Sequence, residues 1–173
     1  MRNLFFAVLA ALLTLTSPAL AGEHPNFEGT WVLDLEASES VEPLLAAQGA
    51  SWAERKLADS VVITQEVSQK EGKVTLEVSS VATNRTDVLL PGEGWKASDA
   101  RRAETARTRC YWIEGGSKLV TETEMTFEDG EKATMLTTRS LAADGQTTII
   151  LIEFKKPDGT HKKAKRVLRK QAS

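Results

Sequence analysis

Short β-rich runs separated by regularly spaced turn signals dominate this sequence from residue 61 onward. The turn signals are six residue pairs, at 71–72, 91–92, 115–116, 129–130, 144–145 and 158–159. The last three are Asp-Gly pairs, which favour the tight turns of β-hairpins. Apolar and polar residues alternate within the runs, so that Val74, Leu76 and Val78 share one face. This period of two is typical of an antiparallel sheet with one buried face.

The runs predict ten strands, at residues 29–35, 61–68, 73–81, 85–90, 94–98, 105–114, 118–127, 132–141, 146–155 and 162–170. A meander with this many long strands has to cover its edges, and closing into a barrel does so. We therefore predict a mainly β fold, a closed antiparallel ten-stranded up-and-down barrel, with a β-sandwich as the alternative. Side chains alone do not fill a barrel of about ten strands, so an internal cavity is expected.

Residues 40–60 have a different character and predict two short helices between the first two strands. Pro43 is compatible with a helix only in its first turn, and Gly49 can provide a left-handed end. Ser51-Trp52-Ala53-Glu54 is a capping box at the start of the second helix. The predicted order is one strand, a helix–turn–helix lid and then a series of hairpins.

The N-terminus has the pattern of an export signal. Arg2 precedes an apolar run over 4–15, and Ala19-Leu20-Ala21 closes with an A-x-A pattern. The apolar run is shorter than the roughly 20 residues that cross a bilayer. We expect residues 1–21 to be a cleaved signal peptide of the short bacterial form, and residues 22–173 to be one domain of a periplasmic or secreted protein.

Charge and rare residue types exclude several functions. The chain has 22 basic and 24 acidic residues, so its net charge does not favour binding to nucleic acid. Cys110 is the single cysteine and cannot form an internal disulfide. His24 and His161 are the only histidines, too few for a three-His metal site, and no P-loop, G-x-S-x-G or H-E-x-x-H motif occurs. No catalytic residue, metal or cofactor is predicted.

The basic run at 161–170 favours two interpretations. Strand alternation disperses its charges over both faces, which is typical of a solvated edge strand. The alternative is contact with an anionic partner, either transiently with a membrane or with nucleic acid. We expect a monomer.

Three segments resemble the fatty-acid-binding-protein family of the lipocalin superfamily. Residues 27–33, Phe-Glu-Gly-Thr-Trp-Val-Leu, are similar to the family's opening F-x-G-T-W-x-L. Gly49 with residues 55–58 is similar to the A-x-G…R-K-L-A of its lid, and residues 90–95 resemble the segment before its fifth strand. The resemblance covers nearly the whole chain after residue 21. It implies a ten-stranded barrel with a helical lid that binds a small apolar molecule, such as a fatty acid.

The resemblance also implies a ligand site. The family holds a carboxylate with two arginines on late strands and a tyrosine two residues after the second. Arg139 and Arg166 are similar in position to these arginines, but Leu168 stands where the tyrosine is expected, so one of three donors is missing. Alternation places Arg139 with Met135 on an inward-type face. The alternatives are solvated arginines at the rim, or arginines paired with an internal Glu.

Two tryptophans complete the predicted ligand-binding residues. Trp31 shares a face with Leu33 and Leu35, which indicates the core or the cavity wall, and Trp52 near the start of the second helix can cover the cavity mouth. The set is therefore Arg139, Arg166, Leu168, Met135, Trp52 and Trp31. The function predicted is extracytoplasmic binding of a small apolar ligand. The alternatives are a ligand-free structural or protein-interaction module of the cell envelope and a lipocalin-type enzyme.

Overall fold

The computed structural model describes residues 24–100 and 102–172. The predicted signal peptide, residues 1–21, lies outside the described residues. Two helices, α1 (Glu42–Ala47) and α2 (Trp52–Ser60), lie between the first two strands as predicted, and a short 3-10 turn, η1, covers Glu114–Gly116. The strands are β1 (Gly29–Asp34), β2 (Thr64–Lys70), β3 (Lys73–Ser79), β4 (Asn84–Leu89), β5 (Lys96–Ser98), β6 (Thr105–Ile113), β7 (Lys118–Thr126), β8 (Lys132–Leu141), β9 (Thr147–Lys155) and β10 (His161–Lys170).

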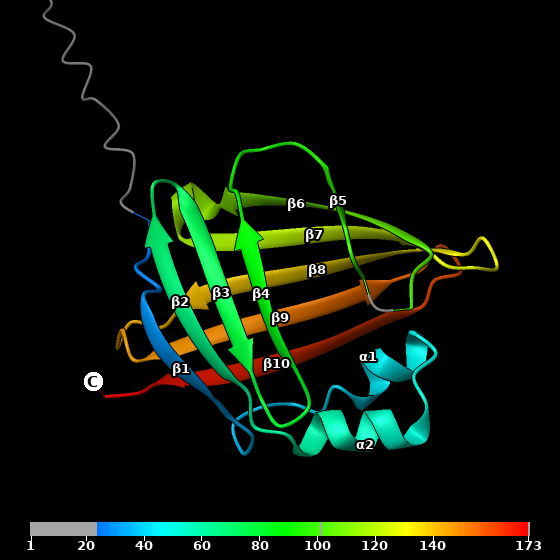
Figure 1. Ribbon diagram of the computed structural model, residues 1–173, viewed down its shortest axis with the longest axis horizontal. Coiled ribbons are helices and arrows are strands. Elements are labelled where there is room, and N and C mark those ends of the chain that lie inside the picture. Colours follow the sequence, from blue (N-terminus) through cyan, green and yellow to red (C-terminus); the bar gives the residue numbers. More distant parts are fainter. Residues whose placement is uncertain (1–23, 101, 173) are drawn as a thin grey trace, which may run out of the picture.

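All ten strands form one antiparallel sheet in the order β4-β3-β2-β1-β10-β9-β8-β7-β6-β5. The first strand pairs with the last, with Leu33 opposite Leu168 and Trp31 opposite Lys170. The sheet curls, so that β2, β3 and β4 cross in front of β6–β10 (Figure 1). The mainly β, ten-stranded antiparallel architecture with a helical pair is therefore confirmed.

The sheet is a curled half-barrel, because its two end strands, β4 and β5, are not hydrogen-bonded to each other. The connection between them contains Pro91, which has no N–H to donate to a neighbouring strand. Pro91 forms an isolated bridge to Cys110 of β6, and β5 is only three residues long. The sequence predicts that hydrogen bonds between strands close the barrel completely. In the structure these hydrogen bonds are interrupted between β4 and β5.

The helical pair lies at one end of the curled sheet (Figure 1). The predicted capping box of α2 is confirmed, since the Ser51 hydroxyl accepts from the Glu54 N–H and the Glu54 carboxylate accepts from the Ser51 N–H. Leu44 of α1 is buried against Phe154 and Ala164 of the sheet. None of the helices in the described part of the chain is long and apolar enough to cross a membrane.

Two apolar clusters occupy the inside of the fold. The lid cluster lies against α1 and contains Leu44, Met125, Ala133, Phe154 and Ala164. The larger one, which we call the floor cluster, contains Phe27, Trp31, Leu33, Val67, Val74, Leu76, Val78, Cys110, Leu119, Ile150 and Leu168. Arg139 follows Ala133 of the lid cluster by six residues of β8. Arg139 therefore lies about 20 Å from Ala133 along the strand, beside the floor cluster.

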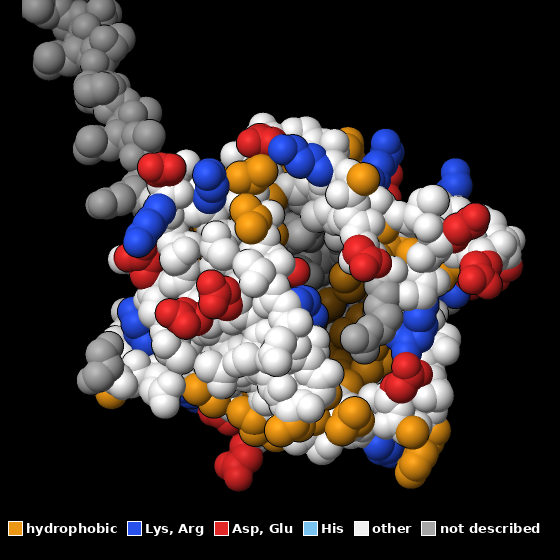
Figure 2. Space-filling view, viewed as in Figure 1, with side chains coloured by type: hydrophobic (Ala, Val, Ile, Leu, Met, Phe, Trp, Pro, Cys, Tyr) orange, Lys and Arg blue, Asp and Glu red, His pale blue; other side chains and the backbone are white. Residues whose placement is uncertain are grey.

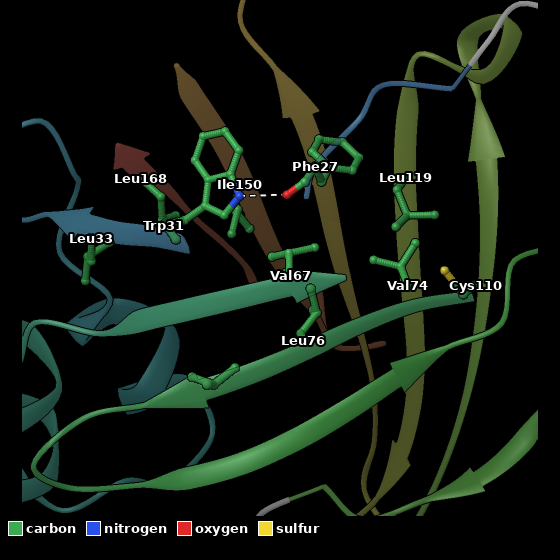
Figure 3. Close-up of a cluster of buried hydrophobic side chains, with 11 residues drawn as sticks. Phe27, Trp31, Leu33, Val67, Val74, Leu76, Cys110, Leu119, Ile150 and Leu168 are labelled. Carbon is green, nitrogen blue, oxygen red and sulfur yellow. Dashed lines mark hydrogen bonds between the residues drawn. The ribbon is translucent and has the colours of Figure 1, made fainter. Parts of the chain in front are cut away.

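Trp31 and Phe27 are the centre of the floor cluster, and both are completely buried. The indole Nε1 of Trp31 donates to the Phe27 carbonyl oxygen at 2.7 Å, which satisfies its only polar atom (Figure 3). Val74 of β3 and Leu119 of β7 point toward one another from opposite walls (Figure 3). The floor cluster thus joins the two walls of the half-barrel.

We expect Trp31→Ala to lower the free energy of unfolding by about 3–5 kcal/mol, because it leaves a large cavity in the floor cluster and an unpaired Phe27 carbonyl. The matched control is Trp52→Ala on α2, where the side chain is 66% exposed and the cost should be about 0.5 kcal/mol or less. Chemical denaturation followed by circular dichroism measures both. Equal losses for the two variants would contradict this account of the core.

Candidate functional site

The register of the strands arranges the inner face of the sheet in rows. Arg166, Ile150, Arg139 and Leu119 are successive Cα partners across β10, β9, β8 and β7, and so form one row. The two arginines lie two strands apart, about 10 Å between strand axes, with Ile150 between them. Ile150 and Leu119 belong to the floor cluster, so this row lies in the floor half of the molecule.

The next row toward the lid is Ala164, Ile152, Thr137 and Thr121. The last three of these are partly exposed although they lie on the inner face, which requires that solvent reaches the interior. The molecule is hollowed in the region between β4 and β5, with apolar side chains in the depth (Figure 2). An internal cavity therefore lies between the floor and lid clusters.

Arg139 is the charged group of this cavity wall, and its side chain is only 5% exposed. Its Nη2 donates to Oε1 of Gln65 at 2.7 Å, and the guanidinium lies 5.8 Å from the centre of the Phe27 ring. Nη1 is buried and has no hydrogen-bond partner among the described residues. Burial lowers the pKa of Arg139 to about 10, so the side chain is still positively charged at neutral pH.

A carboxylate is the group that this arrangement can hold. Burying a cation is costly when its charge and its N–H groups are not matched. The partner of Arg139 is the neutral amide of Gln65, and no described Asp or Glu forms an ion pair with it. A guanidinium fork fits a carboxylate, and the bond between them is charge-assisted.

Gln65 and Thr148 also belong to this site, although the sequence analysis did not identify them. Gln65 of β2 is 8% exposed, and its contact with Arg139 spans 74 residues. Thr148 of β9 is fully buried, and its Oγ1 has no partner within the described chain. Its Cα partner is Leu141, two residues from Arg139, which makes Thr148 and Arg139 diagonal neighbours on one face. Alternation places Gln65 with Val67, but no local pattern reveals a contact across the barrel.

Arg166 has a different environment from Arg139. Its Nη1 donates to the Glu39 carbonyl oxygen at 2.8 Å, in the segment that leads into α1. Burial lowers the pKa of Arg166, and the negative charge of Asp59 on α2 opposes this effect. Asp59 in turn accepts from the Val41 N–H at 2.8 Å. Arg166 therefore fastens the sheet to the base of the helical lid.

The other predicted residues lie in three different places. Leu168 and Trp31 are buried members of the floor cluster. Met135 is partly buried and packs against the lid cluster. Trp52 is turned to solvent at the start of α2. The structure thus brings Arg139, Leu168 and Trp31 to the floor half of the molecule.

The remaining reactive groups do not form a second centre. Burial raises the pKa of the Cys110 thiol to about 11, so it is not a thiolate at neutral pH. The described residues contain no group of three His, Cys, Asp or Glu side chains placed to hold a metal ion.

A depression of about 900 Å³ at the strand ends of β5–β9 is lined by the charged Arg107 and Lys156 at its rim and by Met125 and Ala133 of the lid cluster. Arg107 is paired with Glu124 and Lys156 with Glu131. Since these charges are neutralised within the protein, the uncompensated guanidinium of Arg139 marks the internal cavity as the candidate site.

Comparisons with known proteins agree with this geometry at the level of the fold. No family model and no curated protein matches the sequence. The "REP1-NXSQ fatty acid transporter" superposes with a TM-score of 0.67 at 14% identity, covering 84% of this chain and 96% of that one. Lipid binding protein 8 of Caenorhabditis elegans gives a TM-score of 0.65 at 18% identity, covering 84% and 95%. A Schistosoma mansoni fatty acid binding protein in complex with arachidonic acid gives 0.63 at 18%, covering 84% and 96%.

The chain therefore has the fold of the fatty-acid-binding proteins, with ten antiparallel strands in a curled half-barrel and two helices between the first two strands. The three structures compared above are named for binding or transport of fatty acids or lipids.

We expect Arg166→Gln to loosen the base of the lid, because the Glu39 carbonyl loses its charged donor. A hydrogen bond to a charged group is worth about 1.5–3 kcal/mol, so amide hydrogen exchange over 39–47 should accelerate correspondingly. Exchange measured by mass spectrometry checks this. Lys165→Gln is the control, since the Lys165 side chain is exposed on the same strand. Identical exchange in both variants would rule out the anchoring role.

Proposed function

We propose that this chain binds fatty acids, or closely related apolar molecules with one carboxylate, inside the half-barrel. The observation that carries the proposal is the buried guanidinium of Arg139, which has a neutral partner and an Nη1 without one. The fold of lipid-binding proteins supports the same ligand class.

In this proposal the ligand carboxylate lies against the row of Arg166, Ile150, Arg139 and Leu119. Arg139 donates from Nη1, and the hydroxyl of Thr148 is a second donor from the adjacent strand. The apolar tail runs toward the lid cluster, over the roughly 20 Å between the Arg139 and Ala133 rows. Arg166 remains with Glu39 and Leu168 has no polar atom, so a single arginine carries the anion.

We further propose that the chain is a binding protein rather than an enzyme. The two described rows of the cavity wall, from Arg166 to Leu119 and from Ala164 to Thr121, contain no carboxylate or imidazole. General acid–base chemistry uses such groups near the reacting atoms. The raised pKa of Cys110 also argues against a nucleophilic thiol.

We expect Arg139→Met to weaken binding of octadecanoate by about 1.5–3 kcal/mol, roughly 10- to 150-fold, because one charge-assisted bond is lost. Octadecanol, which has no carboxylate, should bind the variant as well as it binds the original protein. Displacement of a fluorescent fatty acid from the delipidated protein measures both affinities.

Arg107→Met is the matched control, because Arg107 is exposed on the outer face and paired with Glu124. It should leave both affinities unchanged. Equal affinity of the original protein for octadecanoate and octadecanol would remove the carboxylate claim. The absence of saturable binding would remove the lipid claim and favour a ligand-free module of the cell envelope.

We also propose that the protein acts outside the cytoplasm after removal of residues 1–21. The charged start, the short apolar run and the A-x-A pattern support this. The full chain produced in a bacterial host should be recovered from the periplasm or medium with an intact mass that begins at Gly22. A full-length product confined to the cytoplasm would refute it.

Exposed apolar side chains on α2 support a further part of the proposal, transient contact of the lid with a membrane. Trp52 is 66% exposed and Leu57 50% exposed, and the same helix carries the exposed Lys56. Lys56 is paired with Glu42 at 2.7 Å, so the exposed apolar side chains, and not a free basic charge, support this contact.

A further inference from the structure

We infer that the preferred ligand carries an oxygen on its chain, about 7 Å from the carboxylate toward the lid, where Thr121 and Thr137 receive it. This inference rests on the proposed function and deepens it from fatty acids in general to fatty acids oxygenated along the chain. It follows from the chemistry of the row next to Arg139.

Thr121 of β7 and Thr137 of β8 are direct Cα partners on the inner face. Side chains at such positions have Cβ atoms about 4.5–5.5 Å apart, so the two hydroxyls flank one place on the cavity wall. Both residues are partly exposed to the cavity. They lie two residues toward the lid from Leu119 and Arg139, which sets the separation of about 7 Å from the anion-binding row.

These two hydroxyls lack good partners within the protein. Thr121 Oγ1 approaches Cys110 Sγ at 4.0 Å, and sulfur is a weak acceptor. Thr137 Oγ1 has no hydrogen-bond partner in the described chain. The threonines of the next row differ, because Thr108 is bonded to Thr123 at 2.9 Å and to Ser98 at 2.8 Å. Of the two described threonine rows on the lid side of Arg139, the one beside it therefore keeps hydroxyls free for a ligand.

The inner face of β2 and β3 is mostly apolar, with Gln65 and Gln69 as its polar side chains. Val67, Val74 and Leu76 of β2 and β3 are buried in the floor cluster. A chain between the two walls thus meets a mostly apolar wall on one side and the two threonine hydroxyls on the other. A plain alkyl chain that displaces water from the hydroxyls leaves them unpaired, which costs free energy. A hydroxyl or carbonyl oxygen on the chain accepts from them and removes that cost.

The test compares octadecanoate with a series of monohydroxylated octadecanoic acids that differ in the position of the hydroxyl. Two hydrogen bonds to threonine predict that the isomer with its hydroxyl about 7 Å from the carboxylate binds roughly five- to tenfold tighter than octadecanoate. Isomers oxygenated near the tail end, at the lid cluster, should bind more weakly than octadecanoate. Displacement of a fluorescent fatty acid gives the relative affinities.

The double substitution Thr121→Val with Thr137→Val keeps the shape and removes both hydroxyls. It should abolish the preference and strengthen binding of octadecanoate itself. Thr138→Val is the control, since Thr138 lies on the outer face between Val120 and Leu151 and should change neither affinity. If the double variant keeps the positional preference, or the original protein shows none, the inference is wrong.

The outcome separates this inference from the proposed function. Loss of octadecanoate binding in Arg139→Met without any hydroxyl preference would overturn the threonine site and leave the carboxylate site standing. Failure of every carboxylate to bind would overturn both. Circular dichroism of the double variant checks that it is folded before the affinities are compared.

Discussion

The pairing of the first strand with the last is the interaction on which the rest of the structure depends. Leu33 of β1 lies opposite Leu168 of β10, so residues 135 positions apart become neighbours in the sheet. This pairing joins the wall of β2–β4 to the wall of β6–β9 and makes one continuous ladder. Chain closure over such a distance is entropically costly, and the buried floor cluster around Trp31 and Phe27 offsets that cost.

The site is a direct consequence of this closure. Arg139 comes from the C-terminal wall and Gln65 from the N-terminal wall, and they meet only because the sheet curls. An amide satisfies one N–H group of the guanidinium without neutralising its charge. The interior therefore holds a positive charge beside an apolar cluster, which is the combination that an apolar anion requires.

Two arginines in one row of the sheet perform different tasks. Arg139 and Arg166 share one row of the inner face, yet Arg166 reaches the Glu39 carbonyl at the base of the lid. The segment 35–41 passes beside β10, since Glu39 also bonds to the Lys165 backbone. An arginine at that place is held by the lid connection before any ligand arrives. Position in a strand alone does not distinguish the two roles.

The sequence by itself determined the ten strands, the helical pair and its capping box, because alternation, Asp-Gly turns and helix caps are local and each acts over a few residues. It also placed Arg139 on an inward face. Only the tertiary structure decided the rest: the open seam between β4 and β5, the contact of Gln65 with Arg139, the unpaired Thr148 hydroxyl and the diversion of Arg166 to the lid. These features depend on which distant segments meet when the sheet curls. The local periodicity predicts a strand, but it does not determine which residues lie opposite that strand across the barrel.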